Sequence, residues 1–240
     1  MRRLVALFAL LLVLAPWAAA QADTITYNGV QQAGLNIKGY VDYSRRYAST
    51  GEFDISWNEE EVLAAYCADI LSSGLGGSYN VSALSNFDYH IYNNLYRAAW
   101  IMENYAPGLG YDSSYYSDTV AATAVQSAVW ALLTPYRYSP FSLSSVTSGS
   151  STEKSRAKAL YTQILAASAG IDFGSYAFQN MFYFADSNQD KQNLLFATAQ
   201  PGPSVPEPGT MLLMGSALLS GLGLRRKQIV QKLRELLKKT

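Results

Sequence analysis

The sequence has little of the chemistry on which many metal and catalytic sites depend. Its 240 residues include one Cys and one His. A zinc site built from several Cys and His ligands is therefore excluded, and so is a disulfide within the chain. We expect neither a metal ion nor a cofactor.

The middle of the sequence also lacks an excess of positive charge. Only 15% of the residues are charged, against about 25% in average proteins. Between Asp23 and Gln200 the acidic residues outnumber the basic ones by sixteen to nine. Such a segment has no basic stripe to hold a phosphate backbone, so we expect no nucleic-acid partner. The 49% of hydrophobic residues instead predict a folded domain with a core.

The N-terminus has the pattern of a secretory signal peptide. A basic start is followed by an apolar run over residues 4–14 and by the small-residue stop Ala20-Gln21-Ala22. We expect cleavage between Ala22 and Asp23, which removes residues 1–22. A transmembrane anchor is the alternative, but the apolar run is short for a hydrocarbon core of about 30 Å.

The C-terminus has the pattern of a linker followed by a membrane anchor. Residues 201–209 hold four of the eight prolines and end the preceding domain, because proline cannot continue a helix or a central strand. Residues 210–224 are apolar or small and predict a transmembrane helix, and the basic residues 225–240 predict a cytoplasmic tail.

This C-terminal segment resembles the PEP-CTERM sorting signal of Gram-negative bacteria. The resemblance implies export across the inner membrane, recognition by an exosortase, and a destination at the outer surface or in the extracellular biofilm matrix. It rests on a Val-Pro-Glu-Pro motif before the apolar stretch and on a basic cluster after it: Val205, Pro206, Glu207, Pro208, Arg225, Arg226 and Lys227.

Residues 23–200 are long enough for one domain with a real core. Residues 62–70 are ambiguous because they are apolar but rich in Ala, and residues 142–151 form a Ser-rich stretch that we expect to be flexible. Ser117 or Asp118 is expected to cap one helix, and Ser150 with Glu153 another. The sum is an α+β fold. We expect strands over 24–27, 35–41, 53–57, 176–185 and 194–199, and helices over 91–102, 117–135 and 150–170.

The single cysteine stands in a context that changes its interpretation. By composition alone it would be a small buried hydrophobe. However, Tyr66-Cys67-Ala68-Asp69 and the segment from Val125 to Trp130, with the aromatic helix of residues 96–105 between them, resemble the thioester domains of bacterial surface adhesins. In that family the Cys is joined to the Gln of a Thr-Gln-x-Ala-Ile-Trp type segment. Val125 here replaces the Thr and Val129 the Ile.

The resemblance implies an internal thioester between Cys67 and Gln126, with Tyr66, Asp69 and Trp130 as supporting residues. A thiolate is a strong nucleophile, and a carboxamide offers a neutral carbonyl whose nitrogen leaves as ammonia. Such a bond is an electrophile that an amine or hydroxyl on a surface or matrix partner can open. The protein would then be a covalent adhesin that reacts once and not an enzyme.

Three alternatives remain open from the residues. The Cys67–Gln126 bond could be only a structural staple. The 18 Tyr and 4 Trp could serve a non-covalent matrix or carbohydrate-binding protein, in which Cys67 is incidental. A cysteine hydrolase using Cys67 and His90 is the third, although no active-site signature surrounds either residue.

Overall fold

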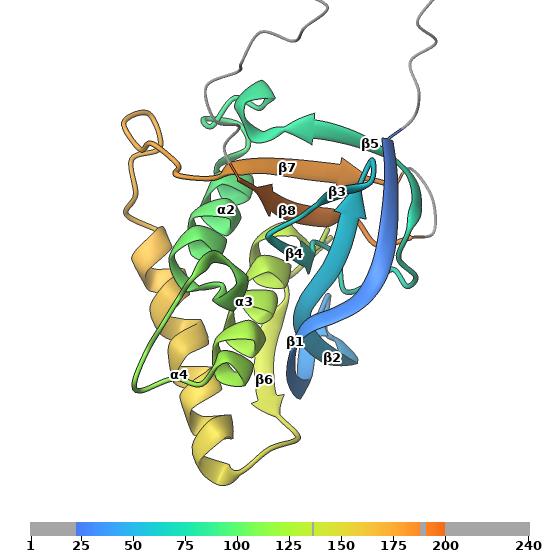
Figure 1. Ribbon diagram of the computed structural model, residues 1–240. Coiled ribbons are helices and arrows are strands. Elements are labelled where there is room, and N and C mark those ends of the chain that lie inside the picture. Colours follow the sequence, from blue (N-terminus) through green and yellow to red (C-terminus); the bar gives the residue numbers. More distant parts are fainter. Residues whose placement is uncertain (1–22, 136, 188–190, 200–240) are drawn as a thin grey trace, which may run out of the picture. The chain divides into compact units, whose positions relative to one another are not determined.

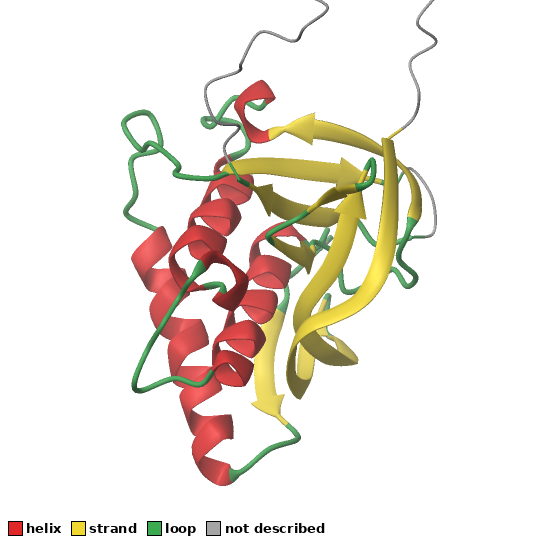
Figure 2. Cartoon of the chain, in the orientation of Figure 1, coloured by secondary structure: helices red, strands yellow, loops and turns green. Residues whose placement is uncertain are grey.

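The computed structural model describes residues 23–135, 137–187 and 191–199. In this part of the chain, strands gather on one side and three helices on the other (Figures 1 and 2). The expected signal peptide (1–22), linker (201–209), transmembrane helix (210–224) and tail (225–240) lie outside the described residues. Among the described residues, no helix has the length and apolar character needed to cross a membrane.

The strands form one antiparallel sheet that closes on itself. Its order is β3-β2-β4-β8-β7-β5-β1-β6, and β1 pairs in addition with β2. The strands are β1 (Asp23–Val41), β2 (Ser44–Trp57), β3 (Glu60–Glu61), β4 (Ala64–Cys67), β5 (Gly77–Ala83), β6 (Ser142–Val146), β7 (Met181–Asp186) and β8 (Leu194–Thr198).

The long β1–β2 hairpin is set by its two-residue turn. Asp42 and Tyr43 have φ angles of 47° and 63°, the left-handed conformation of a hairpin turn that suits the twist of the strands. The Asp42 carboxylate accepts hydrogen bonds from the backbone N–H groups of Arg137, Tyr138 and Ser139 at 2.6–2.8 Å. These bonds lower the pKa of Asp42. The strands predicted over 24–27, 35–41 and 53–57 lie within this hairpin.

Three helices follow as predicted, with bounds close to those expected. They are α2 (Asn93–Tyr105), α3 (Asp118–Leu133) and α4 (Ser151–Ser168). Ser117 caps α3 by accepting the N–H of Val120, and Ser150 with Glu153 forms a complete capping box on α4. Short 3₁₀ turns, η1 (Leu84–Asn86) and η2 (Pro107–Leu109), flank α2.

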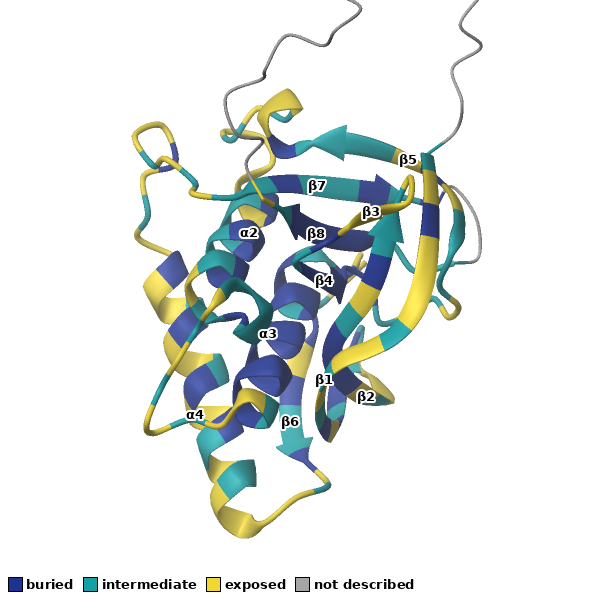
Figure 3. Ribbon diagram, viewed as in Figure 1, coloured by how far each residue is buried: buried dark blue, intermediate teal, exposed yellow. Residues whose placement is uncertain are grey.

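Helix α3 lies at the centre of the core. It contacts β1, β2 and β4 on one side and α2 and α4 on the other, and Figure 3 shows it buried along most of its length. Small side chains such as Ala121, Ala124 and Ala128 let the neighbouring elements approach this closely. The α+β fold class is thus confirmed for the described residues.

Three local expectations need correction. The Ser-rich stretch is not a flexible connection throughout, because Ser142–Val146 forms β6 with Leu143 and Val146 buried against the core. The ambiguous segment contains the fully buried strand β4. The strand expected from residue 176 starts only at Met181. The Glu103 carboxylate holds the preceding loop, since it accepts the Tyr176 hydroxyl and the backbone N–H groups of Gln179 and Asn180.

Candidate functional site

Two neighbouring strands bring Cys67 next to Gln192. Cys67 is the last residue of β4 and pairs in antiparallel register with Leu194, the first residue of β8. The pairing continues past the strand ends, because the N–H of Ala68 donates to the carbonyl of Asn193 at 2.8 Å. Gln192 directly precedes Asn193 in the chain, so the adjacent strands close a sequence separation of 125 residues.

The Cys67 sulfur makes its closest polar contact with the side chain of Gln192. Sγ lies 2.5 Å from Oε1 of the carboxamide. Even O–H···O hydrogen bonds are usually about 2.7–2.8 Å long, and sulfur is larger than oxygen. The contact is therefore too short for an ordinary S–H···O hydrogen bond, and it places the sulfur beside the carboxamide carbon.

The loop after β4 holds the rest of the Gln192 residue. The carboxamide nitrogen Nε2 donates to the Ser72 carbonyl at 2.9 Å, and the backbone N–H of Gln192 donates to the Gly74 carbonyl at 3.1 Å. The Gln192 carbonyl accepts the Tyr79 hydroxyl at 3.3 Å. With these contacts the side chain has one fixed orientation, its oxygen toward Cys67 and its nitrogen toward the loop.

Gln126 also reaches Cys67, but it contacts the backbone and not the sulfur. Its Oε1 accepts the Cys67 N–H at 3.2 Å, and its Nε2 donates to the Cys67 carbonyl at 2.7 Å. Both amide groups are thus used, and the side chain is completely buried. In this geometry the carboxamide that meets the Cys67 sulfur belongs to Gln192, and not to the expected partner Gln126.

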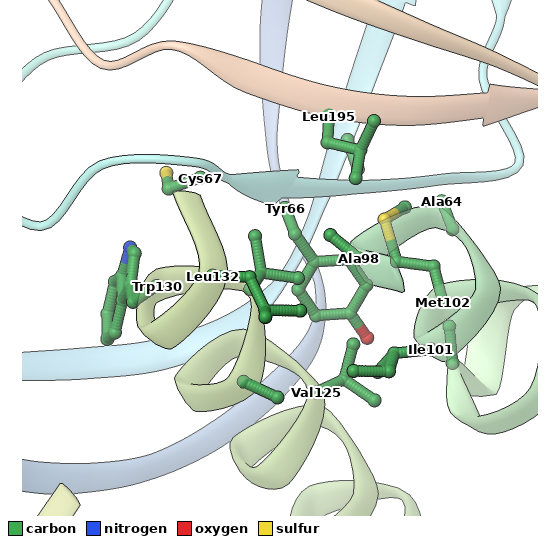
Figure 4. Close-up of a cluster of buried hydrophobic side chains, with 14 of the residues drawn as sticks. Ala64, Tyr66, Cys67, Ala98, Ile101, Met102, Val125, Trp130, Leu132 and Leu195 are labelled. Carbon is green, nitrogen blue, oxygen red and sulfur yellow. The ribbon is translucent and has the colours of Figure 1, made fainter. Parts of the chain in front are cut away.

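The three expected supporting residues have different positions. Tyr66 points to the opposite face of β4, as alternation along a strand requires, and Figure 4 shows its ring directed away from the Cys67 sulfur. Its hydroxyl donates to the buried Glu52 carboxylate at 2.8 Å. Asp69 shapes the loop that holds Gln192, since it accepts the Leu71 N–H at 2.6 Å and the Ser72 hydroxyl at 2.7 Å.

Trp130, the third expected supporting residue, lines a cavity together with Cys67 and Gln192. It lies one helical turn after Gln126 on α3, so both residues face the end of β4. The cavity has a volume of about 540 Å³ and is also lined by Tyr27, Tyr47, Phe53 and the loop of residues 70–75. Cys67 is only 1% exposed, which places the sulfur at the inner wall of this cavity.

Burial controls the acidity of the thiol. Removal from water raises the pKa of Cys67 far above its usual range, and the nearby Asp69 carboxylate raises it further. A free thiolate is therefore unfavourable at this position. A neutral sulfur, either as a thiol or with an acyl group attached, suits the site much better.

The sequence indicated no role for Gln192, and it offered His90 as a possible partner of Cys67 in a cysteine hydrolase. His90 is exposed, its ring lies 4.0 Å from that of Tyr89, and it does not line the cavity. Among the described residues, no group of three or more His, Cys, Asp or Glu could hold a metal ion. Gln192 stands two residues before the predicted strand at 194–199, and no motif around it marks it in the sequence.

Two family models match the chain. Residues 64–169 match the family described as "Thioester domain", and residues 204–227 match the "PEP-CTERM protein-sorting motif". Both resemblances seen in the sequence are confirmed. The first match includes Cys67, Gln126 and Trp130 and ends before Gln192. No curated protein sequence matches.

Two solved structures are similar to the chain. One is the N-terminal thioester domain of a surface protein from Clostridium perfringens, with 15% identity, a TM-score of 0.41, and coverage of 69% of this chain and 99% of that one. The other is the N-terminal domain of the Streptococcus pyogenes pilus tip adhesin Cpa, with 14% identity, a TM-score of 0.44, and coverage of 73% and 99%.

Proposed function

Because the chain carries a thioester domain and a PEP-CTERM sorting motif, we propose that it is a surface protein that attaches covalently to a partner through a thioester between Cys67 and Gln192. The observation that carries this proposal is the 2.5 Å contact between Sγ of Cys67 and Oε1 of Gln192. It favours Gln192 over Gln126, whose carboxamide is already bound to the Cys67 backbone.

The bond forms without an external reagent. The thiol of Cys67 adds to the carboxamide carbon of Gln192, the C–S bond forms, and the C–N bond breaks. The thiol proton leaves with the amide nitrogen as ammonia, so the electrons balance with no oxidant or reductant. Ser72 holds that nitrogen through its carbonyl, and the cavity that Ser72 also lines gives ammonia a way out.

The surroundings protect the thioester from accidental opening. When a nucleophile displaces the sulfur, the leaving group is a thiolate, and burial with Asp69 nearby raises the pKa of that group. A poor leaving group departs only when a proton reaches the sulfur in the same step. Water in bulk does not reach the site freely either, since Cys67 and Gln126 are buried. The thioester is therefore expected to wait for a nucleophile that the cavity holds in place.

The sorting motif defines where this reaction would be used. A PEP-CTERM motif implies processing by an exosortase during export to the cell surface. We propose a Gram-negative host, cleavage after Ala22, and anchoring through residues 210–224 until processing. The partner would then be a component of the outer surface or of the biofilm matrix, and the protein reacts once without turnover.

The staple and the non-covalent binding protein remain as alternatives. A staple has the same thioester but captures no nucleophile from a partner. A non-covalent surface protein has a free thiol at Cys67 and both glutamines intact. The non-covalent protein differs from the proposal in mass, because it has lost no ammonia. The staple has the same mass as the proposal and differs from it in that no added nucleophile opens its thioester.

The deciding experiment is the mass of the purified chain, intact and after proteolysis. Wild type is expected to lack one ammonia, with the peptides of Cys67 and Gln192 joined. Cys67→Ala and Gln192→Ala are expected to have their full mass. Methylamine should add to the Gln192 peptide and release a thiol that reacts with iodoacetamide.

The Gln126→Ala variant separates the two possible pairings. If Gln192 supplies the carbonyl, the folded fraction of Gln126→Ala still lacks ammonia. If Gln126 supplies it, that variant has its full mass and Gln192→Ala does not. A wild-type chain of full mass, with Cys67 alkylated at once and no Gln converted to Glu, would reject the covalent function altogether.

A further inference from the structure

The indole N–H of Trp130 is a buried donor without an acceptor. Trp130 is 2% exposed, and its Nε1 has no hydrogen-bond partner among the described residues. Leaving such a group unsatisfied costs about 1–3 kcal/mol, so most buried donors have a partner. In Figure 4 the nitrogen lies at the edge of the ring nearest Cys67, and Trp130 lines the cavity that Cys67 and Gln192 share.

The remaining wall of this cavity consists of aromatic rings and hydroxyl groups. Tyr27, Tyr47 and Phe53 approach from the β1–β2 hairpin, and Ser72 and Ser73 from the loop after β4. Tyr27 and Tyr47 are 41% and 65% exposed, which places their rings toward the solvent. No lining residue in the described part of the chain carries a charge.

This lining discriminates between the two kinds of acceptor that could open a thioester. An indole N–H only donates. A lysine amine must be neutral to open a thioester, and it uses its one lone pair in the attack, so it cannot also accept from Trp130. No carboxylate of the described lining would take up its proton. A sugar hydroxyl accepts as well as donates, and the apolar faces of sugar rings pack on aromatic side chains. The volume of about 540 Å³ also falls in the usual range for small-ligand sites.

We propose that the cavity beside Cys67 and Gln192 binds a neutral carbohydrate, with the Trp130 N–H donating to a sugar oxygen and with Tyr27 and Tyr47 against the sugar rings. This inference rests on the proposed thioester. A sugar hydroxyl adds to the Gln192 carbonyl carbon, a C–O ester bond forms and the C–S bond breaks. The hydroxyl proton passes to Sγ, so Cys67 is left as a neutral thiol.

The test compares three nucleophiles on the purified full chain by intact mass. A panel of cellobiose, maltose and N,N′-diacetylchitobiose represents neutral carbohydrate, Nα-acetyllysine represents a protein amine, and methylamine is too small to need the cavity. We expect disaccharide adducts on Gln192 at a rate that saturates with concentration. Trp130→Phe is expected to lower the ratio of the disaccharide rate to the methylamine rate roughly threefold to tenfold, the effect of one hydrogen bond.

The Trp130 ring also packs against Phe141, so Trp130→Phe could change the rate through a folding defect. A second variant therefore tests the inference independently. Tyr47→Ala removes an exposed ring at the cavity and should also lower the ratio of the disaccharide rate to the methylamine rate. Tyr43→Ala, which removes an exposed ring outside the cavity lining, is the matched control and should change nothing. The loss of ammonia in each variant verifies that its thioester has formed.

Three results would overturn the inference. Nα-acetyllysine could react while no disaccharide does, which would identify a protein amine as the acceptor. Trp130→Phe could slow methylamine as much as disaccharide, which would give the indole a role in the chemistry instead of in recognition. Methylamine could react with the wild type and no disaccharide could add. By contrast, a wild-type chain that has its full mass and adds no methylamine would contradict the proposed thioester itself.

Discussion

At the scale of single residues, Gln126 fixes the backbone of the reactive cysteine. A carboxamide is one of the few side chains that can satisfy an N–H and a C=O of the same residue, and Gln126 does both for Cys67. The sulfur is then held on the other side of the strand end, toward Gln192. In the proposed reaction Gln126 is thus a positioning residue for Cys67.

Gln126→Glu tests this positioning role. A carboxylate can still accept the Cys67 N–H, but its second oxygen meets the Cys67 carbonyl, and a charge is buried without a partner. We expect a loss of roughly 3–5 kcal/mol in the free energy of unfolding, measured by urea denaturation. Gln163→Glu, an exposed position on α4, should lose little. An unchanged stability of Gln126→Glu would contradict the two hydrogen bonds.

Glu52 is a second buried polar residue, and it gives the stability a pH dependence. Burial raises its pKa, and the hydrogen bonds from Tyr66 and Gly108 only partly oppose this effect. Oε1 has no partner among the described residues. A carboxyl with a raised folded-state pKa contributes its full stability below the pKa of the unfolded chain, about 4.3 for Glu, and loses it as the pH rises through the folded-state value.

Glu52→Gln is therefore expected to flatten the pH dependence. The amide imitates the neutral acid, so the variant should unfold at higher urea concentration than wild type at pH 8. The advantage should shrink as the pH falls, because a raised pKa favours the neutral form of wild-type Glu52 at acidic pH. Glu60→Gln changes an exposed carboxylate on β3 and is the control. A variant less stable than wild type at pH 8 would show that Glu52 is buried in its charged form.

The sequence motifs correctly predicted which residues lie near Cys67, but they did not predict which carboxamide meets its sulfur. The order Cys67, Gln126, Trp130 correctly predicted three residues at one place in the fold. It could not assign the bond, because two glutamines end within reach of one cysteine and only strand pairing decides which meets the sulfur. Gln192 has no distinguishing neighbours in the sequence, and its role follows from the β4–β8 register.

At the scale of elements, local signals predicted the helices better than the strands. Caps such as Ser150 with Glu153 lie within four residues and mark the start of α4 directly. The strand β5 and the strand β6 carry weak alternation, and they form because β1 offers them a free edge. Their partners are distant in the sequence, which is information that a local pattern does not hold.

The capping box of α4 makes a direct test of these local signals. Ser150→Ala removes the acceptor for the Glu153 N–H, 3.2 Å away, and one of the two groups that bind the Glu153 carboxylate. We expect a loss of about 1 kcal/mol in the free energy of unfolding, with a small loss of helical circular dichroism. Ser151→Ala, the next residue and also exposed, should have almost no effect, and equal losses in both would contradict the cap.

At the scale of the whole molecule, the proposed thioester is a cross-link between two strands that are already paired. Ala64–Cys67 and residues 194–197 are hydrogen-bonded in register in this structure, where Cys67 is a free cysteine. Formation of the thioester should leave the native structure almost unchanged. The thioester acts instead on the unfolded chain, whose conformational entropy it lowers by closing a loop of 125 residues. Capture of a partner would open that loop, so the reacted protein should be the less stable one.

Treatment with methylamine measures this difference in stability, because methylamine opens the thioester without attaching a partner. In the chain-entropy treatment of cross-links, a loop of this length stabilises by roughly 4–5 kcal/mol. Treated wild type is expected to unfold at lower urea concentration by that amount, and to match untreated Cys67→Ala within the effect of one buried sulfur. Methylamine should not change Cys67→Ala at all. The contradicting outcome is that treated and untreated wild type unfold at the same urea concentration while the mass confirms the methylamine adduct. The β4–β8 pairing, and not the thioester, would then account for the stability. The domain would then keep its full stability after it has captured its partner.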